Sequence, residues 1–567
     1  MPYHITDLPV ELFLDNILPL LPIPDLLNIG CVDHHFAQLT SDETFWHRKI
    51  QEDFNFSRSE TARKNGWKFL YSRLSHPGVF VWGERSNGRL GLTENKLPQP
   101  VLRDGVPCPV RLRIPGVRIV SLIAGGWSFH ALDSRGDIYV WGVLQGMMGA
   151  LRSDGYSLPS KRTEGPMRLN LPVKIRNISC GRSHCAALDV NSQIWMCVSW
   201  GRPFQLSTPL LDRSSPETTA IQITSGWTFS AVLTDSGEVL VYRPFSGDME
   251  TVIATKTEEL DQQSATTKAL PTEQAPHVIP CYTWTMQGVE SVRLPSIPVR
   301  DLPKLDGNGS TNEGETKLVK IAGADETIIG LTNKGHVLAY HLIGGENRNS
   351  HQSWVYLPEF SEVEKVRQHE TFTGTPSEGQ SRPEPPETMH ITHISAQFRT
   401  FTAYSTGERS VVIMGKLEEP GVGPQPGAPR LLPIILPALQ NRGVISVVLG
   451  DYHYGALTAD GKLLTWGAYS KGALGLGDPT KIPLGQPGGF VTEEELRGAA
   501  SALRWGILRH PPPDVTVPTE VKFDHGEGKR REQFCFAVAA AGWHMGALVI
   551  DLEVRHHRST IWGCDTE

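Results

Sequence analysis

The chain has 567 residues, a formal net charge of −7 at pH 7 and a pI near 6.3. This length exceeds a single simple core unless a repeated unit extends one domain. The acidic balance argues against a surface that grips phosphates over the whole molecule, so we expect no nucleic-acid partner. The 55 glycines and 42 prolines favour many short strands joined by tight turns.

The eight cysteines are scattered along the chain, and no Cys-x-x-Cys pair occurs. We therefore expect neither a metal nor a redox site, and no cofactor. No run of about 18 uninterrupted apolar residues is present, and the polar start MPYHITDLPVE differs from a signal peptide. The sequence thus predicts a reduced, soluble intracellular protein in the cytoplasm, the nucleus or both, with no membrane partner.

Residues 1–55 predict a small group of helices. Pro9 and Glu11 suit a first helical turn, and Pro22 and Pro24 end one helix and begin another. The first helix has apolar residues near the i, i+3, i+4, i+7 spacing, at Val10, Phe13, Leu14, Ile17, Leu18 and Leu21. So short a segment cannot hide all of its apolar surface. The remainder must meet another surface, and nine acidic residues against two basic ones give it an acidic rim.

Several motifs in this segment resemble an F-box: LPxE at Leu8–Glu11, the leucine-rich run Ile17–Leu27, the spacing of Val32 to Leu39, and Phe45-Trp46. The resemblance implies docking on the adaptor Skp1 and, through it, on a cullin–RING ubiquitin ligase. The residues that it assigns to Skp1 binding are Leu8, Pro9, Ile17, Leu20, Leu21, Leu26, Leu27, Val32, Phe36, Leu39 and Trp46, the last half core and half interface. The alternative is that these helices only cap the rest of the chain.

Residues 56–78 are expected to form a helical linker. Its apolar side chains should pack on the next domain, and they are Trp67, Phe69, Leu70 and Leu74.

From Val79 onward, one two-part pattern recurs. The first part is a strand that ends in Trp-Gly, as in VFVWG at Val79–Gly83, IYVWG at Ile138–Gly142 and LLTWG at Leu463–Gly467, with a last copy at Thr560–Gly563. The second part is a small-residue turn followed by an apolar strand, and it occurs seven times. Turns such as DSRG, TDSG, TNKG and TADG supply glycine for positive φ in hairpins. Strand-rich units of this size must stack on copies of themselves.

WGERSNGRLGL at Trp82–Leu92 and WGAYSKGALGLGD at Trp466–Asp478 resemble the RCC1 repeat. The predicted fold class is therefore mainly β: a seven-bladed RCC1-like β-propeller over residues 79–567, preceded by a small α-helical F-box. Eight strands of the Trp-Gly type against seven turn motifs suggest that both ends of the propeller share one blade, so we expect VFVWG to pair with the C-terminal strands and close the ring. An F-box and RCC1-type repeats in one chain resemble the fungal SCF-associated factor family.

Long gaps between the repeats predict insertions. The segments near 250–276, 301–317, 367–390 and 418–430 are rich in Ser, Thr, Glu, Gly or Pro and are expected to be loops or disordered. The insertion 478–533 is expected to be partly helical. Thr492 and the glutamates after it suit a helix start, and the helix has an apolar stripe at Leu496, Ala499 and Leu503.

Two groups of side chains could suggest chemistry. Cys180, His184 and Cys185 lie close together, but no fourth ligand follows at a fitting distance, so no metal site is expected. His130, His184, His453 and His544 recur in or beside the turn motif. Because catalysis needs a partnered acid or nucleophile, we interpret these histidines as hydrogen-bonding struts.

We therefore expect a non-catalytic adaptor: an SCF subunit that binds Skp1 through its F-box and an unknown protein substrate through its propeller, for ubiquitination and proteasomal degradation. One alternative is an RCC1-like guanine nucleotide exchange factor for a small GTPase. Its difficulties are the negative charge and the lack of a basic N-terminal tail. Another alternative is a scaffold that binds Skp1 without ubiquitin transfer.

Overall fold

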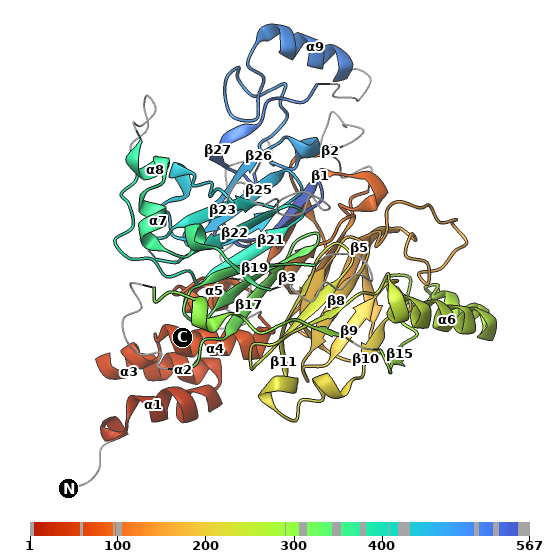
Figure 1. Ribbon diagram of the computed structural model, residues 1–567, viewed down its shortest axis with the longest axis horizontal. Coiled ribbons are helices and arrows are strands. Elements are labelled where there is room, and N and C mark those ends of the chain that lie inside the picture. Colours follow the sequence, from red (N-terminus) through yellow and green to blue (C-terminus); the bar gives the residue numbers. More distant parts are fainter. Residues whose placement is uncertain are drawn as a thin grey trace, which may run out of the picture.

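Seven β-sheets arranged as a ring, with a group of helices against one side, make up the chain (Figure 1). The computed structural model describes residues 5–56, 61–93, 97, 105–289, 291–305, 314–342, 353–374, 382–407, 409–417, 431–503, 510–524 and 532–553. The seven sheets confirm the predicted propeller, and each is called a blade below.

The first three blades are numbered in chain order from the one that contains β1. Blade 1 contains β28 (Gln533–Ala541), β29 (His544–Asp551), β1 (Gly78–Glu84) and β2 (Gly105–Leu112). Blade 2 contains β3 (Ile119–Ala124), β4 (Ser128–Asp133), β5 (Ile138–Gly142), β6 (Thr163–Asn170) and β14 (Val278–Pro280). Blade 3 contains β7 (Ile175–Cys180), β8 (Cys185–Asp189), β9 (Ile194–Cys197), β10 (Phe204–Leu206) and β15 (Trp284–Met286).

The remaining four blades complete the ring. Blade 4 contains β11 (Ala220–Ser225), β12 (Ser230–Thr234), β13 (Val239–Tyr242) and β16 (Val292–Arg293). Blade 5 contains β17 (Leu318–Gly323), β18 (Thr327–Thr332), β19 (Val337–His341) and β20 (Val355–Tyr356). Blade 6 contains β21 (His393–Gln397), β22 (Thr400–Tyr404) and β23 (Val412–Lys416). Blade 7 contains β24 (Val444–Leu449), β25 (His453–Thr458), β26 (Leu463–Gly467) and β27 (Val515–Glu520).

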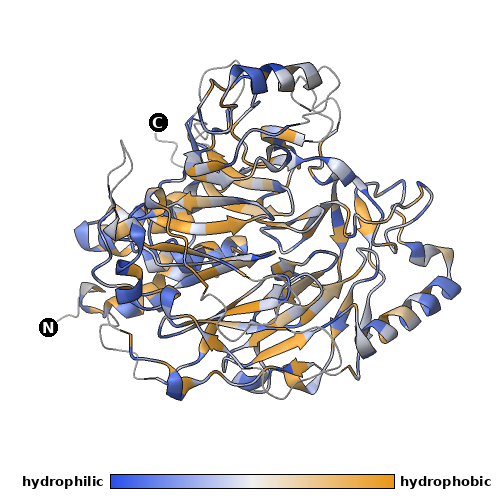
Figure 2. Cartoon of the chain, turned by 45° about the horizontal axis from the view of Figure 1, so that its top comes forward, coloured by the Kyte–Doolittle hydropathy of each residue, from blue (hydrophilic) through white to orange (hydrophobic). Residues whose placement is uncertain are grey.

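Second and third strands such as β12 and β13 are buried along their whole length, because each sheet is covered by a neighbouring blade on both faces. Figure 2 shows hydrophobic residues concentrated on the strands of the sheets, whereas the outlying helices are mostly hydrophilic. The hairpin turns between them use the predicted glycines: Gly136 has φ of 82° and Gly461 also has φ of 82°. The repeat sequence thus fixes both the strands and the turns that join them.

The expected closure of the ring is confirmed. Strand β1 pairs antiparallel with β29, from Gly78 opposite Val549 to Gly83 opposite His544. Blade 1 therefore combines the first strand of the propeller with its last. The indole Nε1 of Trp82 donates to the carbonyl oxygen of Ala473 at 2.7 Å, which ties this blade to blade 7. The sequence repeat at Thr560–Gly563 lies outside the described residues.

The N-terminal helices are short. They are η1 (Ile5–Asp7), α1 (Val10–Leu12), a π-helical segment η2 (Phe13–Ile17), η3 (Leu18–Leu20), α2 (Ile23–Gly30), α3 (His34–Leu39), α4 (Glu43–Phe54) and α5 (Trp67–Arg73). The predicted first helix is thus a chain of three helical types, and Pro19 lies in the 3₁₀ turn that ends it. Asp33 and Asp42 accept backbone N–H groups at the starts of α3 and α4.

In the described part of the linker, Trp67–Arg73 form the helix α5, and three of the linker's four predicted apolar side chains are buried. Trp67, Leu70 and Leu74 are buried in a core cluster that also contains residues of α4 and of blades 1 and 2. Phe69 is 36% exposed, and its ring lies edge-on to Phe534 at 5.1 Å between centroids. The helices and the propeller therefore share one hydrophobic core.

The prediction of loop or disorder near 250–276 is wrong for its first part. Residues Gly247–Gln263 form the helix α6, and η8 (Ala265–Lys268) follows it. Met249 of this helix is buried in a hydrophobic core cluster. The guanidinium of Arg202 forms an ion pair with Asp261 of the helix at 2.5 Å. Beyond these helices, the insertion supplies β14 and β15, which pair in parallel with β6 and β10.

The other insertions give a mixed result. In the region 367–390, the structure places α8 (Glu370–Thr373) just after α7 (Val363–Arg367), because Val366 and Phe372 are buried against blade 6. The helix predicted after Thr492 is present as α9 (Glu493–Leu503). Its first turn has a capping box: the backbone N–H of Glu495 donates to Thr492 Oγ1, and the backbone N–H of Thr492 donates to the Glu495 carboxylate. The predicted segment 418–430 and most of 301–317 lie outside the described residues.

Candidate functional site

Four of the residues assigned to Skp1 binding are buried in the chain's own core. Leu26 and Trp46 are each 1% exposed, Leu39 is 5% exposed and Phe36 is 9% exposed. The expectation that they contact a partner is therefore corrected: they hold the helices together. Trp46, expected at the interface in part, donates its indole N–H to Thr40 O at 2.8 Å inside this core.

The other assigned residues remain accessible. Leu8 is 38% exposed, Leu20 is 83% exposed and Val32 is 68% exposed. Pro9 is also exposed, and Ile17, Leu21 and Leu27 are half-buried. We call these seven residues the apolar docking surface.

The sequence assignment missed three further exposed apolar side chains in this segment: Ile5 at 57%, Val10 at 44% and Leu12 at 40%. The expected i, i+3 spacing placed Val10 on the same helix face as the core residue Phe13. The break into η2 turns Val10 outward while Phe13 stays 1% exposed. A pattern of period 3.6 could not have found this, because the period itself changes at the π-helical segment.

Acidic residues surround the apolar docking surface, as the sequence predicted. The exposed ones are Asp7, Glu11, Asp15, Asp25 and Asp33. Arg48 from α4 pairs with Asp15 at 2.6 Å, and both side chains are about half exposed. Such a surface pair contributes little to stability, on the order of 0–1 kcal/mol. The surface therefore combines exposed leucine and valine with net negative charge.

The N-terminal helices and the linker cover one face of the propeller, on the side where the innermost strands begin. Asn55 donates from Nδ2 to Ile175 O at 2.9 Å, at the first residue of β7. The backbone N–H of Ala62 donates to Ile445 O at 2.7 Å, at the start of β24. These contacts belong to blades 3 and 7, so the end of α4 and the linker together reach across this face.

The opposite face contains the seven turns that join each innermost strand to the second strand. Backbone hydrogen bonds link the turns of neighbouring blades. The N–H of Trp227 donates to Asp325 O at 3.1 Å, that of Asp325 to Phe398 O at 2.9 Å, and that of Asp451 to Gly542 O at 2.9 Å. We call this side the free face. Helices α6 and α9 project outward from the ring in Figure 1, away from α1–α4.

Arg182 fills the centre of the free face. Its guanidinium lies 4.1 Å from the ring centroid of Trp227, 5.7 Å from Phe398 and 5.8 Å from Trp127. It also pairs with Asp451. Because these partners come from four different blades, the side chain closes the axis.

Exposed apolar side chains surround this centre. On the turns of the free face, Tyr452 is 51% exposed, Trp227 is 37% exposed and Trp543 is 36% exposed. Met147 and Met148 are 79% and 68% exposed in the β5–β6 loop, whose Gly146 lies against Trp127. Aromatic residues, methionine and arginine are enriched in the centres of protein–protein interfaces.

Three of the recurring histidines, His130, His184 and His544, are buried hydrogen-bonding struts, as predicted. His453 is also buried, but neither of its ring nitrogens has a hydrogen-bond partner among the described residues. His184 Nε2 lies 2.9 Å from Ser230 Oγ and His544 Nε2 lies 3.3 Å from Ser128 O, in each case on the next blade. His130 lies 3.2 Å from Cys180 Sγ and accepts the indole N–H of Trp200 at 3.3 Å. Burial lowers the pKa of His130 to about 3 and the pKa of His184 to about 4. These side chains are therefore neutral at physiological pH.

Within the described ranges, no group of three or more His, Cys, Asp or Glu side chains is arranged to hold a metal ion. Cys180 and Cys185 are buried opposite each other on β7 and β8. None of the helices in the part of the chain that the structure describes is long and apolar enough to cross a membrane.

No family model matches the chain. F-box protein pof9 of Schizosaccharomyces pombe is 21% identical over 96% of this chain and 91% of its own length. SCF-associated factor 1 of Saccharomyces cerevisiae is 36% identical over 112 residues, which are 19% of this chain and 14% of that protein. The chain resembles F-box proteins with RCC1-type repeats.

The similarity to RCC1-type proteins extends to plants. RCC1 domain-containing protein RUG3 of Arabidopsis thaliana is 29% identical over 29% of this chain and 37% of its own length. The chain thus spans well under half of that relative. Among solved structures, yeast RCC1 (Prp20) bound to Kap60 has a TM-score of 0.48 at 14% identity, covering 87% of this chain and 93% of that chain. The propeller assignment here rests on the seven sheets themselves.

Proposed function

We propose that this chain is a non-catalytic adaptor of an SCF ubiquitin ligase, in which the apolar docking surface binds Skp1 and the propeller binds the protein to be ubiquitinated. The observation that carries the proposal is the exposure of Leu8, Leu20 and Val32. They lie in a helical segment whose core side chains are buried, since Phe13, Leu26 and Trp46 are each 1% exposed. Exposed apolar side chains beside a filled core are typical of a binding surface. Similarity to F-box protein pof9 over 96% of the chain supports the same role.

The shared core of α4, α5 and the propeller suits an adaptor. Trp67 is 2% exposed, stacks on His47 at 4.1 Å, and its backbone N–H donates to Glu43 at 2.7 Å. A rigid joint fixes the distance between a bound substrate and the ligase machinery, which raises the effective concentration of the reacting groups.

The free face of the propeller is the proposed substrate surface, because the linker and the N-terminal helices occupy the other face. Trp227, Tyr452 and Trp543 surround its centre, which the half-buried Arg182 occupies. Tyrosine, tryptophan and arginine dominate the binding energy of many interfaces.

Co-purification tests the Skp1 step. The double variant Leu8→Ala/Leu20→Ala should reduce recovered Skp1 at least tenfold, and the thermal midpoint of the chain should stay within about 1 °C because both side chains are exposed. The matched control is Leu432→Ala, since Leu432 is 73% exposed but lies on the propeller. Undiminished Skp1 recovery with the double variant would overturn the docking proposal.

A second measurement addresses substrate capture and the exchange-factor alternative. With the proteasome blocked, a Trp227→Ala/Tyr452→Ala variant should lose captured proteins while it retains Skp1. Nucleotide release from small GTPases should be unchanged by the wild-type chain. Stimulated release would favour the exchange-factor alternative.

A further inference from the structure

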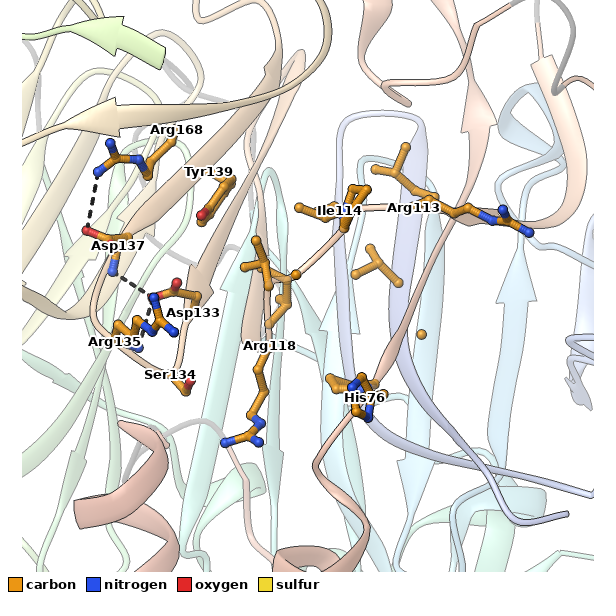
Figure 3. Close-up of a pocket in the computed structure, with 18 of the residues that line it drawn as sticks. His76, Arg113, Ile114, Arg118, Asp133, Ser134, Arg135, Asp137, Tyr139 and Arg168 are labelled. Atoms are coloured by element: carbon orange, nitrogen blue, oxygen red, sulfur yellow. Dashed lines mark hydrogen bonds and ion pairs between the residues drawn. The ribbon is translucent and has the colours of Figure 1, made fainter. Parts of the chain in front are cut away.

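A wide cavity lies where the linker meets blades 1 and 2, on the side of the N-terminal helices (Figure 3). Its volume is about 940 Å³. It is bounded by Ser75–Val79 at the end of the linker, the β2–β3 loop Arg111–Ile119, the β4–β5 turn and Arg168 of β6. We call it the junction pocket.

The junction pocket is strongly basic in a chain whose net charge is −7. Five arginines line it, together with His76, against two carboxylates: Arg111, Arg113, Arg118, Arg135 and Arg168, with Asp133 and Asp137. This is the reverse of the acidic rim around the apolar docking surface.

Both carboxylates are already engaged. Asp133 is buried, and its Oδ1 accepts the backbone N–H groups of Arg135 at 2.9 Å and Asp137 at 2.8 Å, which holds the turn. Asp137 pairs with Lys174 at 2.8 Å and lies 4.0 Å from Arg168. The acids therefore do not neutralise the remaining arginines.

Arg111, Arg113, Arg118 and Arg135 pair with no carboxylate of the described residues. Arg118 donates to Ser75 O at 3.4 Å, and its guanidinium lies 4.4 Å from the ring centroid of Phe54 in α4. Burial lowers the pKa of Arg118, Tyr71 opposes that change, and the nearby charge of Arg135 lowers the pKa further. Figure 3 shows the Arg118 side chain running between Ser134 and His76, whereas Arg113 extends away from that group.

We propose that the junction pocket binds a phosphorylated peptide segment of a partner protein, whose phosphoryl oxygens pair with Arg111, Arg118 and Arg135. A phosphoserine or phosphothreonine brings about two negative charges and oxygens that match the fork of a guanidinium. The cavity is far larger than one ion needs, since a water molecule occupies about 30 Å³ of liquid. Its walls also include Ile114, Val117 and Tyr139, which suit the neighbouring peptide residues.

A nucleic acid fits the pocket less well, because the surrounding chain is acidic and would repel a long polyanion. The proposal concerns peptide binding alone, so it stands or falls independently of Skp1 docking.

Fluorescence anisotropy with the full chain tests the proposal. The probe is a degenerate ten-residue peptide pool with a central phosphoserine, compared with the same pool unphosphorylated. The phosphorylated pool should bind at least tenfold more tightly, and binding should weaken as salt rises from 50 to 300 mM. The variant Arg111→Gln/Arg135→Gln should lose at least tenfold in affinity. Both side chains are exposed, so the fold should be retained.

The matched control is Arg152→Gln/Arg497→Gln, two exposed arginines on other loops and helices, which should bind as the wild type does. Three results would overturn the proposal: equal affinity for the two pools, unchanged affinity in the Arg111→Gln/Arg135→Gln variant, or tighter binding of a ten-nucleotide single-stranded RNA. Competition by 1 mM inorganic phosphate that removes all peptide binding would also overturn it, since a free anion would then suffice.

Discussion

Arg182 and Asp451 face each other across the axis of the propeller and form a two-pronged ion pair, with Nη1 and Nη2 of the arginine 3.1 and 3.2 Å from Oδ2 of the aspartate. Their side chains are only 13% and 9% exposed. The pair joins blade 3 to blade 7 directly, although 269 positions separate the two residues in the chain. It is therefore a tertiary link that closes the centre of the free face.

Replacing Arg182 by alanine should lower the free energy of unfolding by about 3 kcal/mol, because the Asp451 carboxylate is left nearly buried without its partner. Urea denaturation monitored by tryptophan fluorescence measures the change. The control is Arg497→Ala, whose ion pair with Glu493 has both side chains at least 75% exposed and should matter by less than about 0.5 kcal/mol. Equal effects of the two substitutions would contradict the role given to Arg182.

The buried histidines predict a loss of stability in mild acid. Burial lowers the pKa of His130 to about 3 and the pKa values of His184 and His453 to about 4, whereas the unfolded chain has histidine pKa values near 6.5. Below about pH 6.5, the unfolded state takes up protons that the folded state refuses. Stability should then fall by up to about 1.4 kcal/mol per pH unit for each histidine until the folded pKa is reached.

Buried or half-buried carboxyls oppose this trend, because burial raises the pKa values of Asp133, Asp325 and Asp451. Burial raises the pKa of Asp325 to about 7, so its folded form keeps a proton that the unfolded form releases above about pH 4. Its contribution to stability therefore rises as the pH falls, and it offsets at most one histidine. Urea titrations at pH 7, 6 and 5 measure the slope, and His453→Gln should reduce it by about 1.4 kcal/mol per pH unit. An unchanged slope in that variant would refute the assignment.

The shared core predicts that the helices and the propeller unfold together. In Trp67→Ala, the lost packing should cost about 3 kcal/mol and separate the two parts, so that amide hydrogen exchange in α3 and α4 rises at least tenfold. Phe69→Ala is the control, since Phe69 is 36% exposed and its loss should leave exchange in α4 nearly unchanged. Independent unfolding of α1–α4 in the wild-type chain would show that the joint is not rigid.

Trp82 offers a test of ring closure. Its indole is fully buried and donates to Ala473 O, so Trp82→Phe removes a hydrogen bond and leaves a buried carbonyl unpaired. The expected loss is about 2 kcal/mol in urea denaturation. Trp543→Phe, on the free face at 36% exposure, should change stability by less than about 0.5 kcal/mol. Similar losses of unfolding free energy in the two variants would argue against the stabilising role of the hydrogen bond that Trp82 makes between blades 1 and 7.

The blade count and the closure were predictable because the repeat carries local signals. A turn such as DSRG, with Gly136 at positive φ, and a strand that ends in Trp-Gly mark the same place in each blade. The pairing of β1 with β29 followed from counting one more strand motif than turn motifs. These inferences depend on residues adjacent in sequence.

The remainder depends on contacts that sequence patterns do not encode. Helix α6 was missed because its polar composition resembles a loop, whereas tertiary contacts hold it in place: the pair of Asp261 with Arg202 and the burial of Met249. Leu26, Phe36 and Leu39 were assigned to a partner because an apolar residue suits an interface and a core equally well. The junction pocket gave no signal at all, since its arginines are spread from Arg111 to Arg168 and meet only in the folded chain.

The strand that closes the ring also underlies the docking helices. Phe56 after α4 lies against Phe536 of β28, and Arg73 of α5 donates to Leu552 O just beyond β29. During synthesis, the N-terminal helices and α5 can therefore make these packing contacts only after β28 and β29 have been synthesised. A chain that lacked β28 and β29 would present these helices without part of the surface on which they pack, and their exposed apolar face would be less well ordered.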